Sequence, residues 1–484
     1  MTPDLDPRHT AAIALTRFGL GAGAGEIDTV SADPTGWLDA QIRPDGAPLP
    51  QGEFETSSAR VQSFLDYQGA ARQARGMTRE AGADAGAGAD PAAQAAFDAR
   101  RASRRDLTQD TAQEFLARAD LGATTPAGFA ERWALFWANA FTVSATKFQS
   151  AVFMGQYERE AIRPHVFGRF DDLTVAAETH PAMLLYLDQA QSIGPNSPAG
   201  ERRQAGLNEN LAREILELHT VGTDGGYSQA DVTEFARALT GWSIPNNRDG
   251  STGRSGRAQQ MGAPSRDGFV FRANVHEPGA RTVMGRSYAE GGVGQGEAIL
   301  RDLANRPETA RRLSRNIARH FVADDPPAGL VARLEAAWTG SNGDLAQVAR
   351  ALISSPDAWD PRPTKIKTPY DFIVSSHRAL GTRPRRPQPL QQALIQMGQP
   401  AFSAPSPEGW PDTVGDWAGP DALVKRMNWA KTVGETAQTS DPDAVAAGAL
   451  GPRLSDRSRL AIARAESRPE ALTLFLMSPE FQRR

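Results

Sequence analysis

Apolar residues recur at three- and four-residue steps along most of this chain, which is the spacing of one face of an α-helix. The clearest example is the segment 131–141, where Trp133, Phe136, Trp137 and Phe141 form one broad aromatic stripe. Alternation of apolar and polar residues, which marks a half-buried strand, is nearly absent. The pattern therefore predicts an all-α fold with long loops.

Several further segments carry the same spacing and are expected to be helices. They are residues 180–187, 311–321, 330–338, 344–353, 422–432 and 469–477. Thr179 is placed to cap the first of these, and Pro181 falls in its first turn, where a missing N–H costs nothing. No stretch between the helices resembles a long flexible linker, so we expect a single compact multi-helix body over residues 1–484.

The sequence also predicts irregular stretches and one pair of short strands. Residues 76–95 form an Ala/Gly-rich tract that we interpret as a mobile insertion, and residues 245–268 form a polar, glycine-rich loop. Short apolar runs at 269–271 and 282–284 predict one small β-hairpin across the turn at 276–279.

The segment 206–242 is the most informative part of the chain, because it predicts two helices joined by a tight glycine turn. With an advance of about 100° per residue, one side of the first helix collects Asn210, Arg213, Glu214 and Glu217. His219 falls on the opposite, apolar side, so Glu217 and His219 cannot bind one metal ion from a regular helix. We interpret His219 as a core histidine with one nitrogen bonded to a carbonyl group.

The second helix of this pair begins after the turn at 222–227. Ser228 is its expected N-cap, and Asp231, three positions later, completes a capping-box pattern. Arg237 lies on the polar side of this helix. Two antiparallel helices, each with an arginine among carboxylates, would form a shared polar cleft if both polar sides face inward.

The composition argues against several classes of function. The 484 residues carry a formal net charge of -4, which gives no electrostatic case for a nucleic-acid partner. Without cysteine the chain has no disulfide, thiolate metal site or cysteine nucleophile. No run approaches the ~18 apolar residues of a membrane span, and the first residues do not resemble a signal peptide. The sequence as it stands therefore predicts a cytoplasmic protein without a membrane span.

Two glycine motifs are weak signals for a cofactor. Asp224-Gly225-Gly226 contains a single carboxylate and lacks the alternating acidic positions of a calcium loop. The glycines of residues 19–25 follow a helical pattern and not a strand, which argues against a dinucleotide-binding turn. The sequence therefore assigns no cofactor and leaves any metal open.

Taken together, these elements resemble DUF1800, a bacterial family of unknown function. The resemblance rests on the 208–242 block and on shorter motifs spread over nearly the whole chain. These motifs are residues 15–19, 135–141, 180–184, 275–279, 319–322 and 478–481. Many family members look exported, and their genes often neighbour those of a sulfatase-like family. The resemblance therefore implies an exported or periplasmic location and a sulfatase-like protein as partner.

The chain departs from the family pattern at several positions. Many members carry histidines where this chain has Ala138 and Ala140. If those histidines serve a metal, this chain has lost that part of the site. The usual aspartate and lysine appear as Glu277 and Arg281, which keep the charge. The export signal is missing, which weakens the transfer of the envelope location.

The sequence leaves two functions open. In the first, the protein is a binding, scaffold or accessory protein whose buried polar residues fix helix register while a surface recruits a partner. In the second, it is an enzyme, a hydrolase or transferase, that acts on an anionic substrate in a polar Asn/Arg/Glu/His cleft. Because no complete catalytic constellation can be named, the first is slightly favoured.

The candidate site residues come from the two predicted helices and the loops around them. The candidate acid–base residues are Glu214, Glu217 and His276. The candidate binding residues are His180, Asn208, Asn210, Arg213, Asp224, Arg237, Trp242 and Arg281. This candidate site requires that the polar side beginning at Asn210 is turned inward, towards other protein.

Overall fold

The protein is described here from a computed structural model. The structure describes residues 6–81, 91–203, 206–245, 267–437 and 441–484. Over these residues the chain is mainly helical, and its strands form two small antiparallel sheets of two strands each. The expected all-α class with a small β element is confirmed.

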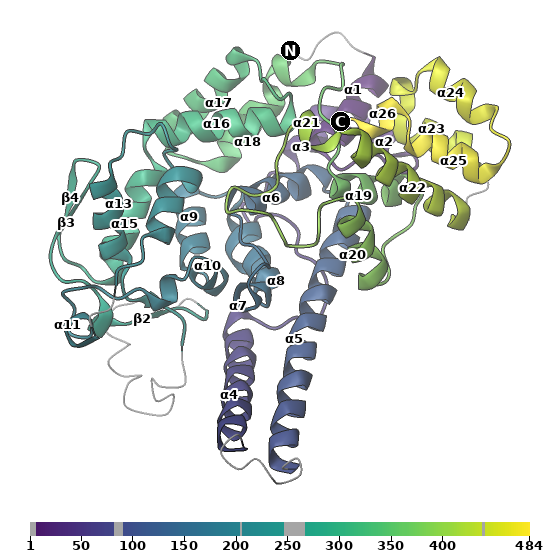
Figure 1. Ribbon diagram of the computed structural model, residues 1–484. Helices are drawn as coiled ribbons and strands as arrows, with labels where there is room; N and C mark the ends of the chain where they lie inside the picture. The colour runs from purple at the N-terminus through teal and green to yellow at the C-terminus, as the bar shows by residue number, and fades with distance from the viewer. Residues whose placement is uncertain (1–5, 82–90, 204–205, 246–266, 438–440) are drawn as a thin grey trace.

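The first half of the chain builds part of the body and a long arm that projects from it (Figure 1). Its helices are α1 (Pro7–Ile13), η1 (Ala14–Phe18), α2 (Glu26–Val30), α3 (Pro34–Asp39), α4 (Ser57–Ala81), α5 (Pro91–Thr124), α6 (Gly128–Ala140), α7 (Phe148–Ala151), α8 (Met154–Gln156), η2 (Tyr157–Ile162), η3 (Arg163–His165), α9 (Phe170–Thr179), α10 (Pro181–Tyr186), η4 (Gln189–Gln191) and α11 (Gly200–Arg203).

The arm consists of α4 and α5, which run side by side and project from the body (Figure 1). Ala74 and Ala96 are buried in it, as expected for small residues at a helix–helix contact. The expected irregular insertion at 76–95 is therefore corrected in part, because residues 76–81 and 91–95 are helical. Alanine is the strongest helix former, so an Ala-rich tract without apolar periodicity extends both helices. Residues 82–90 lie outside the described residues.

The predicted helix pair is present as α12 (Asn210–Glu214), η5 (Ile215–His219) and α13 (Gln229–Leu239). Both hydrogen bonds of the expected capping box between Ser228 and Asp231 are formed at the start of α13. The first helix is not regular throughout, because η5 is a turn of π-helix. A π-turn changes the angular spacing of side chains, so a wheel drawn for a regular helix does not hold beyond Glu214.

The strands pair differently from the expected hairpin. The four strands are β1 (Trp242–Ser243), β2 (Val270–Phe271), β3 (Arg281–Val283) and β4 (Arg286–Tyr288), with the short helix η6 (Ala273–Val275) between β2 and β3. β1 pairs with β2 and β3 pairs with β4, so the two runs predicted to pair lie in different sheets. Met284 and Gly285 both have positive φ, which reverses the chain directly after β3 and selects β4 as its partner. The polar loop expected at 245–268 lies outside the described residues except at its ends.

The second half of the chain completes the body and adds a group of helices at the C-terminal end (Figure 1). Its helices are α15 (Val293–Ala304), α16 (Pro307–Phe321), α17 (Ala328–Gly340), α18 (Leu345–Ser354), η7 (Pro356–Trp359), α19 (Pro369–Ala379), α20 (Pro387–Gln396), α21 (Val414–Trp417), α22 (Pro420–Thr436), α23 (Pro442–Leu450), η8 (Gly451–Arg453), α24 (Asp456–Ala463), α25 (Arg468–Leu476) and α26 (Pro479–Gln482).

Aromatic side chains fill the centre of the body. The predicted stripe of α6 is buried throughout, from Trp133 to Phe141. Phe321 at the end of α16 packs against it, with its ring centroid 5.8 Å from that of Trp133. Offset and tilted ring pairs of this kind add to the free energy of simple burial. This packing fixes α16 against α6 and so positions the residue next to Phe321, which is His320.

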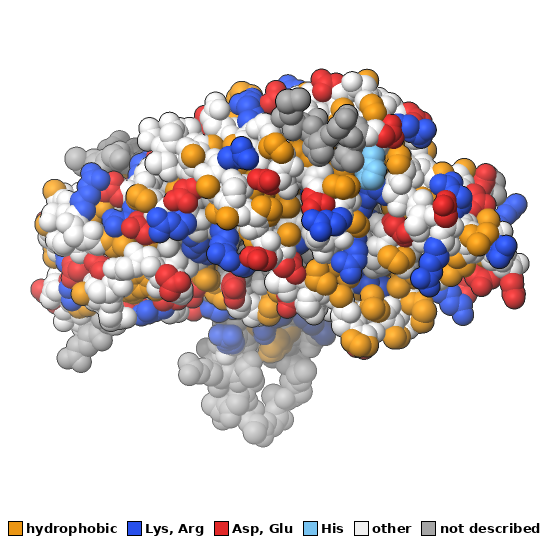
Figure 2. All heavy atoms as spheres, turned by 90° about the horizontal axis from the view of Figure 1, so that it is seen from above, with side chains coloured by type: hydrophobic (Ala, Val, Ile, Leu, Met, Phe, Trp, Pro, Cys, Tyr) orange, Lys and Arg blue, Asp and Glu red, His pale blue; other side chains and the backbone are white. Residues whose placement is uncertain are grey.

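The surface seen in Figure 2 carries acidic and basic side chains interspersed over most of its area. Within the described ranges, no helix has the length and apolar character that a bilayer crossing demands.

Candidate functional site

The polar side of α12 and η5 forms a half-exposed network at the surface. The Arg213 side chain is 36% exposed and lies 3.2 Å from Glu209, while that of Glu217 is 26% exposed. Arg213 also donates to Gln229 of α13 at 2.9 Å. Asn210 is exposed. The polar side beginning at Asn210 is therefore not turned inward as the candidate site required. Its side chains join α12 to the start of α13 and stay in contact with solvent.

Asn208 and Glu214 lie beside this network. Asn208 donates to the carbonyl of Leu187 at 3.1 Å and accepts from the backbone N–H of Asn210 at 2.9 Å, which fixes the entry into α12. Glu214 is half-buried, and burial, followed by the nearby Glu217, raises its pKa.

His219 lies in the core, as expected, but its partner differs from the expected carbonyl group. Its Nδ1 lies 2.7 Å from Oε1 of Glu178 in α9, and both side chains are fully buried. The pair links η5 to α9 inside the protein. Among the described residues, no group of three or more His, Asp or Glu side chains is arranged to hold a metal ion.

A second group of predicted residues lies at the end of α13. Arg237 and Arg281 both contact Glu234, and the Arg281–Glu234 distance is 3.2 Å. Glu277 is buried, accepts from the backbone N–H of Asn196 at 2.8 Å and lies 4.0 Å from Arg237. These ion pairs hold the loop before β3 against α13.

His276 and Trp242 belong to the same region and are both buried. His276 Nδ1 lies 2.8 Å from the carbonyl oxygen of Thr240, so this nitrogen carries the proton and donates it. Burial lowers the pKa of His276. Trp242 is the first residue of β1, and its ring packs edge-on against that of Phe269.

His180 is buried between α10 and the arm. Its Nδ1 accepts from the backbone N–H of Ala182 at 3.1 Å, so in the neutral ring Nε2 carries the proton and donates to Ser57 Oγ at 2.8 Å. Burial lowers the pKa of His180 to about 3. A histidine in this tautomer cannot take the proton of Ser57, so the pair is not a serine nucleophile with its base. His180 is also the N-cap of α10, in place of the expected Thr179.

The remaining predicted residue, Asp224, lies on a groove that also contains Glu217. This groove has a volume of about 970 Å³. Its lining includes Glu217, Asp224, Arg312, Arg315, Asn316, Arg319, His320 and residues 408–413. One side of α16, the turn after η5 and the loop before α21 therefore line the groove together.

The sequence of α16 is amphipathic. Leu313, Ile317 and Phe321 are spaced four apart and buried in the core. Arg312 and Arg319 lie on another side of the same helix, and both line the groove. Arg312 donates to the carbonyl oxygen of Thr220 at 3.4 Å. Neither guanidinium has a carboxylate within 4.0 Å among the described residues, which leaves both charges available to a ligand.

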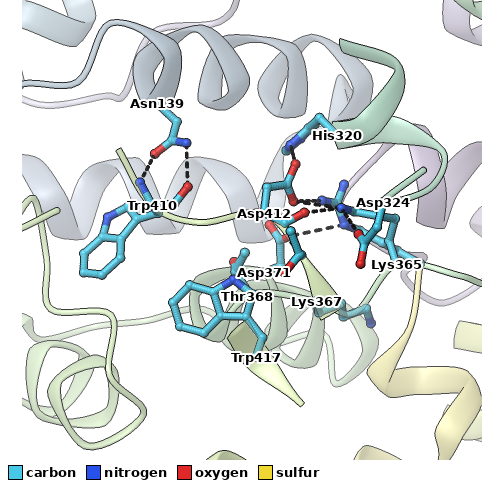
Figure 3. A network of polar contacts seen from close by, with 12 residues as sticks. Asn139, His320, Asp324, Lys365, Lys367, Thr368, Asp371, Trp410, Asp412 and Trp417 are labelled. Carbon is cyan, nitrogen blue, oxygen red and sulfur yellow. Dashed lines mark hydrogen bonds and ion pairs between the residues drawn. The ribbon is translucent and has the colours of Figure 1, made fainter. Parts of the chain in front are cut away.

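His320 also lines the groove and forms a close pair with Asp412 (Figure 3). Its Nδ1 lies 2.8 Å from Oδ2 of Asp412, and the His320 side chain is 17% exposed. Burial lowers the pKa of His320 to about 4, although Asp412 opposes this. The imidazole is therefore neutral at pH 7, donates its Nδ1–H to Asp412 and keeps the lone pair on Nε2. Nε2 is buried and has no hydrogen-bond partner among the described residues.

Asp412 is held by cations from two other segments (Figure 3). Arg484 lies 3.2 Å and Lys365 3.4 Å from its Oδ1. Burial alone would raise the pKa of Asp412, but His320, Arg484 and Lys365 outweigh it and hold the pKa below the ordinary value. Asp412 thus stays ionised, and its charge fixes the orientation of His320.

A smaller cavity of about 110 Å³ lies on the other side of this pair. Its walls include buried side chains such as Phe115, Arg132, Met154 and Tyr370, so we call it the inner cavity. Asn139, His320, Trp410, Pro411 and Asp412 line both the inner cavity and the groove. One layer of side chains therefore separates the two spaces, and the His320–Asp412 pair is part of it.

Trp410 is fixed in this layer by Asn139, as Figure 3 shows. The Asn139 side chain donates to the Trp410 carbonyl at 3.0 Å and accepts from the Trp410 backbone N–H at 2.8 Å. Gly409 makes this approach possible, because its φ is +92° and a Cβ atom there would lie 2.7 Å from the Asn139 carbonyl oxygen. We call residues 408–413 the strap.

Two of the positions at which the sequence differs from the pattern expected of the family that it resembles, Ala138 and Ala140, lie at this place. Ala138 lines the inner cavity and Ala140 lines the groove. The sequence pattern did not single out His320 or Asp412 as site residues, although His320 stands in one of the family motifs. No spacing rule joins them, since they are 92 positions apart and meet only through the packing of α16 and the strap.

Comparison with known proteins places this chain in a family. The comparisons with curated proteins and with solved structures each gave no match. The family model described as "Protein of unknown function (DUF1800)" matches residues 13–483. The match covers nearly the whole chain, so the protein belongs to the DUF1800 family.

Proposed function

We propose that this protein is an enzyme, a hydrolase or transferase, that acts on an anionic substrate bound in the groove along α16. The observation that carries the proposal is the His320–Asp412 pair, in which one imidazole nitrogen is held by a carboxylate and the other has no partner among the described residues. A histidine oriented in this way is the usual acid–base group of enzymes that transfer a proton from water or a hydroxyl group.

In this proposal each nitrogen of His320 has its own role. With the Nδ1 proton donated to Asp412, Nε2 accepts a proton from the attacking water or hydroxyl group, and the imidazolium that forms is stabilised by the adjacent carboxylate. Returning that proton to the leaving group restores the neutral ring. Nε2 is buried, so substrate must displace part of the shared layer to reach it.

Two guanidinium groups in the groove wall support an anionic substrate, although the lining also includes the carboxylates of Glu217, Asp224, Glu308, Glu408, Asp412 and Asp416. Arg312 and Arg319 line the groove without a carboxylate partner within the described residues, and a guanidinium binds phosphate, sulfate or carboxylate through paired N–H donors. Burial lowers the pKa of Arg312 to about 10, which leaves it charged at pH 7. A bound anion next to His320 would also raise the low pKa of this histidine and so make it a stronger base.

The test combines binding and turnover. Inorganic phosphate and sulfate are titrated by calorimetry into the wild type, the double variant Arg312→Ala/Arg319→Ala and the control Arg333→Ala, which lies on α17. The proposal predicts binding that only the double variant loses. Absence of phosphate and sulfate binding in the wild type contradicts it.

Turnover is measured with chromogenic phosphate, sulfate and carboxylate esters. Positioned acid–base groups typically contribute about 10²–10⁴-fold in rate, so His320→Gln should lose about 100-fold or more while the control His377→Gln does not. If the protein is instead an accessory to a sulfatase-like partner, His320→Gln changes no turnover and affects only the yield of the complex. Unchanged turnover in a folded His320→Gln protein therefore rejects the enzyme proposal.

A further inference from the structure

The inner cavity adjoins the His320–Asp412 pair, but the proposed acid–base chemistry does not use it. Much of its lining is apolar, with Phe115, Met154, Leu394 and Phe402 among the residues that form it. Its volume is about 110 Å³. An apolar cavity of about 150 Å³ is enough to bind benzene in another protein, so this space suits a group of ring size or slightly smaller.

The charged side chains in the cavity wall already have partners. Arg118 lies 3.0 Å from Glu158, and Arg132 lies 3.1 Å from Asp371. The Arg118 guanidinium also stacks over the Tyr370 ring at 4.8 Å. An additional charge placed here would be desolvated without a free counter-ion, whereas a neutral group would not be. The wall therefore favours an uncharged occupant.

The cavity and the groove are close enough to hold two parts of one molecule. The layer between them consists of His320, Asp412, Asn139 and the strap residues Trp410 and Pro411. Within this layer Trp410 is held to Asn139 by two hydrogen bonds, at 3.0 and 2.8 Å. The two spaces therefore meet at this layer, beside His320.

We propose that the inner cavity binds a neutral, ring-sized group of the substrate whose anionic group lies in the groove. The substrate class is then an aryl or similarly small cyclic ester or anhydride of an anionic acid, with the bond to be broken next to His320. The position of the anionic end rests on the proposed function, but the preference of the cavity for a neutral ring does not.

Three small molecules test the groove and the inner cavity, first separately and then together. Inorganic phosphate tests the groove, phenol tests the cavity, and phenylphosphonate tests both together. In calorimetric titrations of the full-length protein, phenylphosphonate should bind at least about 10-fold more tightly than phosphate, because burying the ring adds apolar contact. Ala138→Leu fills the cavity from α6 and should abolish this gain and phenol binding, while leaving phosphate affinity unchanged.

A second filling variant and a control guard against misfolding. Ala401→Leu enters the cavity from another segment of its wall and should act like Ala138→Leu. Ala351→Leu on α18 is the control and should bind all three probes as the wild type does.

The outcomes distinguish the two proposals. Equal affinities for phosphate and phenylphosphonate, with no phenol binding, overturn the cavity proposal and leave the groove intact. Phenol binding that Ala138→Leu abolishes, in a protein that binds no phosphate, supports the cavity and overturns the proposed function. A gain for phenylphosphonate that survives both filling variants also overturns the cavity proposal, because the ring then lies elsewhere.

Discussion

His320 Nδ1 and Asp412 Oδ2 lie 2.8 Å apart although 92 positions of the chain separate the two residues. Asp412 is in turn contacted by Lys365 and Arg484, so four segments meet at one carboxylate (Figure 3). A carboxylate in this position serves the fold and the orientation of the imidazole together. For variants of this pair, both the free energy of unfolding and the catalytic activity must therefore be measured.

Asp412→Asn should destabilise the protein and remove the carboxylate that fixes the proton of His320 on Nδ1. Removing one partner of a largely buried charge cluster leaves Lys365 and Arg484 with fewer counter-charges, at a cost of about 3 kcal/mol. The free energy of unfolding at pH 7, measured with denaturant, tests this. The control is Asp416→Asn, since Asp416 is exposed and only completes a capping box with Thr413. Equal losses in the two variants would contradict the central role of Asp412.

The stability of the protein should fall between pH 6.5 and pH 4, in part because of His320. Burial lowers the pKa of His320 in the folded state from 6.5 to about 4, so in this range the unfolded chain binds more protons. The stabilisation is complete above pH 6.5 and is lost as the pH falls towards 4. From pH 6.5 to pH 5 the loss is about 2 kcal/mol at most.

His320→Gln should flatten this part of the stability profile, and the denaturation midpoint measured at several pH values checks it. Because His180 and His377 also have lowered pKa values and remain, the slope should decrease but not vanish. A His320→Gln profile parallel to that of the wild type would rule out a buried, neutral His320.

Ser57→Ala should cost stability without any loss of turnover. The Ser57 hydroxyl accepts from His180 Nε2, whose other nitrogen is engaged at the start of α10, so the pair is a structural tie between α10 and α4. Loss of one buried hydrogen bond costs about 1–3 kcal/mol. A thermal melt gives the first quantity and the ester assay the second. A turnover loss comparable to that of His320→Gln would show that Ser57 is a nucleophile after all.

Arg213→Ala should cost less than about 1 kcal/mol, because its ion pair with Glu209 is half-exposed and solvent already screens it. A buried pair at this place, as the inward-facing arrangement required, would cost about 3 kcal/mol or more. Denaturant titration separates the two values. The buried pair Arg163–Glu131, 2.6 Å apart, provides the contrast, and Arg163→Ala should show the large loss.

Gly409→Ala should weaken the strap. The backbone at Gly409 has a φ of +92°, and an added Cβ would lie 2.7 Å from the Asn139 carbonyl oxygen and from Thr142 Oγ1. Strain of this kind costs about 1–3 kcal/mol. Amide hydrogen exchange of Trp410 should therefore accelerate, while Gly415→Ala, where a Cβ meets only Thr413 Oγ1 at 3.7 Å, should leave it unchanged. Unchanged exchange in Gly409→Ala would show that the strap tolerates a side chain there.

The sequence alone determined the local structure well. The aromatic stripe of α6 and the capping box of α13 are each decided by residues three or four positions apart, and the start of α10 is marked by a proline in its first turn. Such patterns predict helices directly. The motifs from residue 15 to residue 481 also identified the family. These features are local or are carried by order along the chain, and both can be read without coordinates.

The tertiary structure decided which polar residues share an environment. Arg213 and Glu217 form a polar side in any helical projection, but whether it faces protein or water depends on what packs above it, and here it stays half-exposed. The partner of β3 depended on the turn at Met284, and the bond between His320 and Asp412 depended on α16 packing against α6 beneath the strap. Contacts across such distances follow from the packing of the whole core, and no spacing in one sequence encodes them.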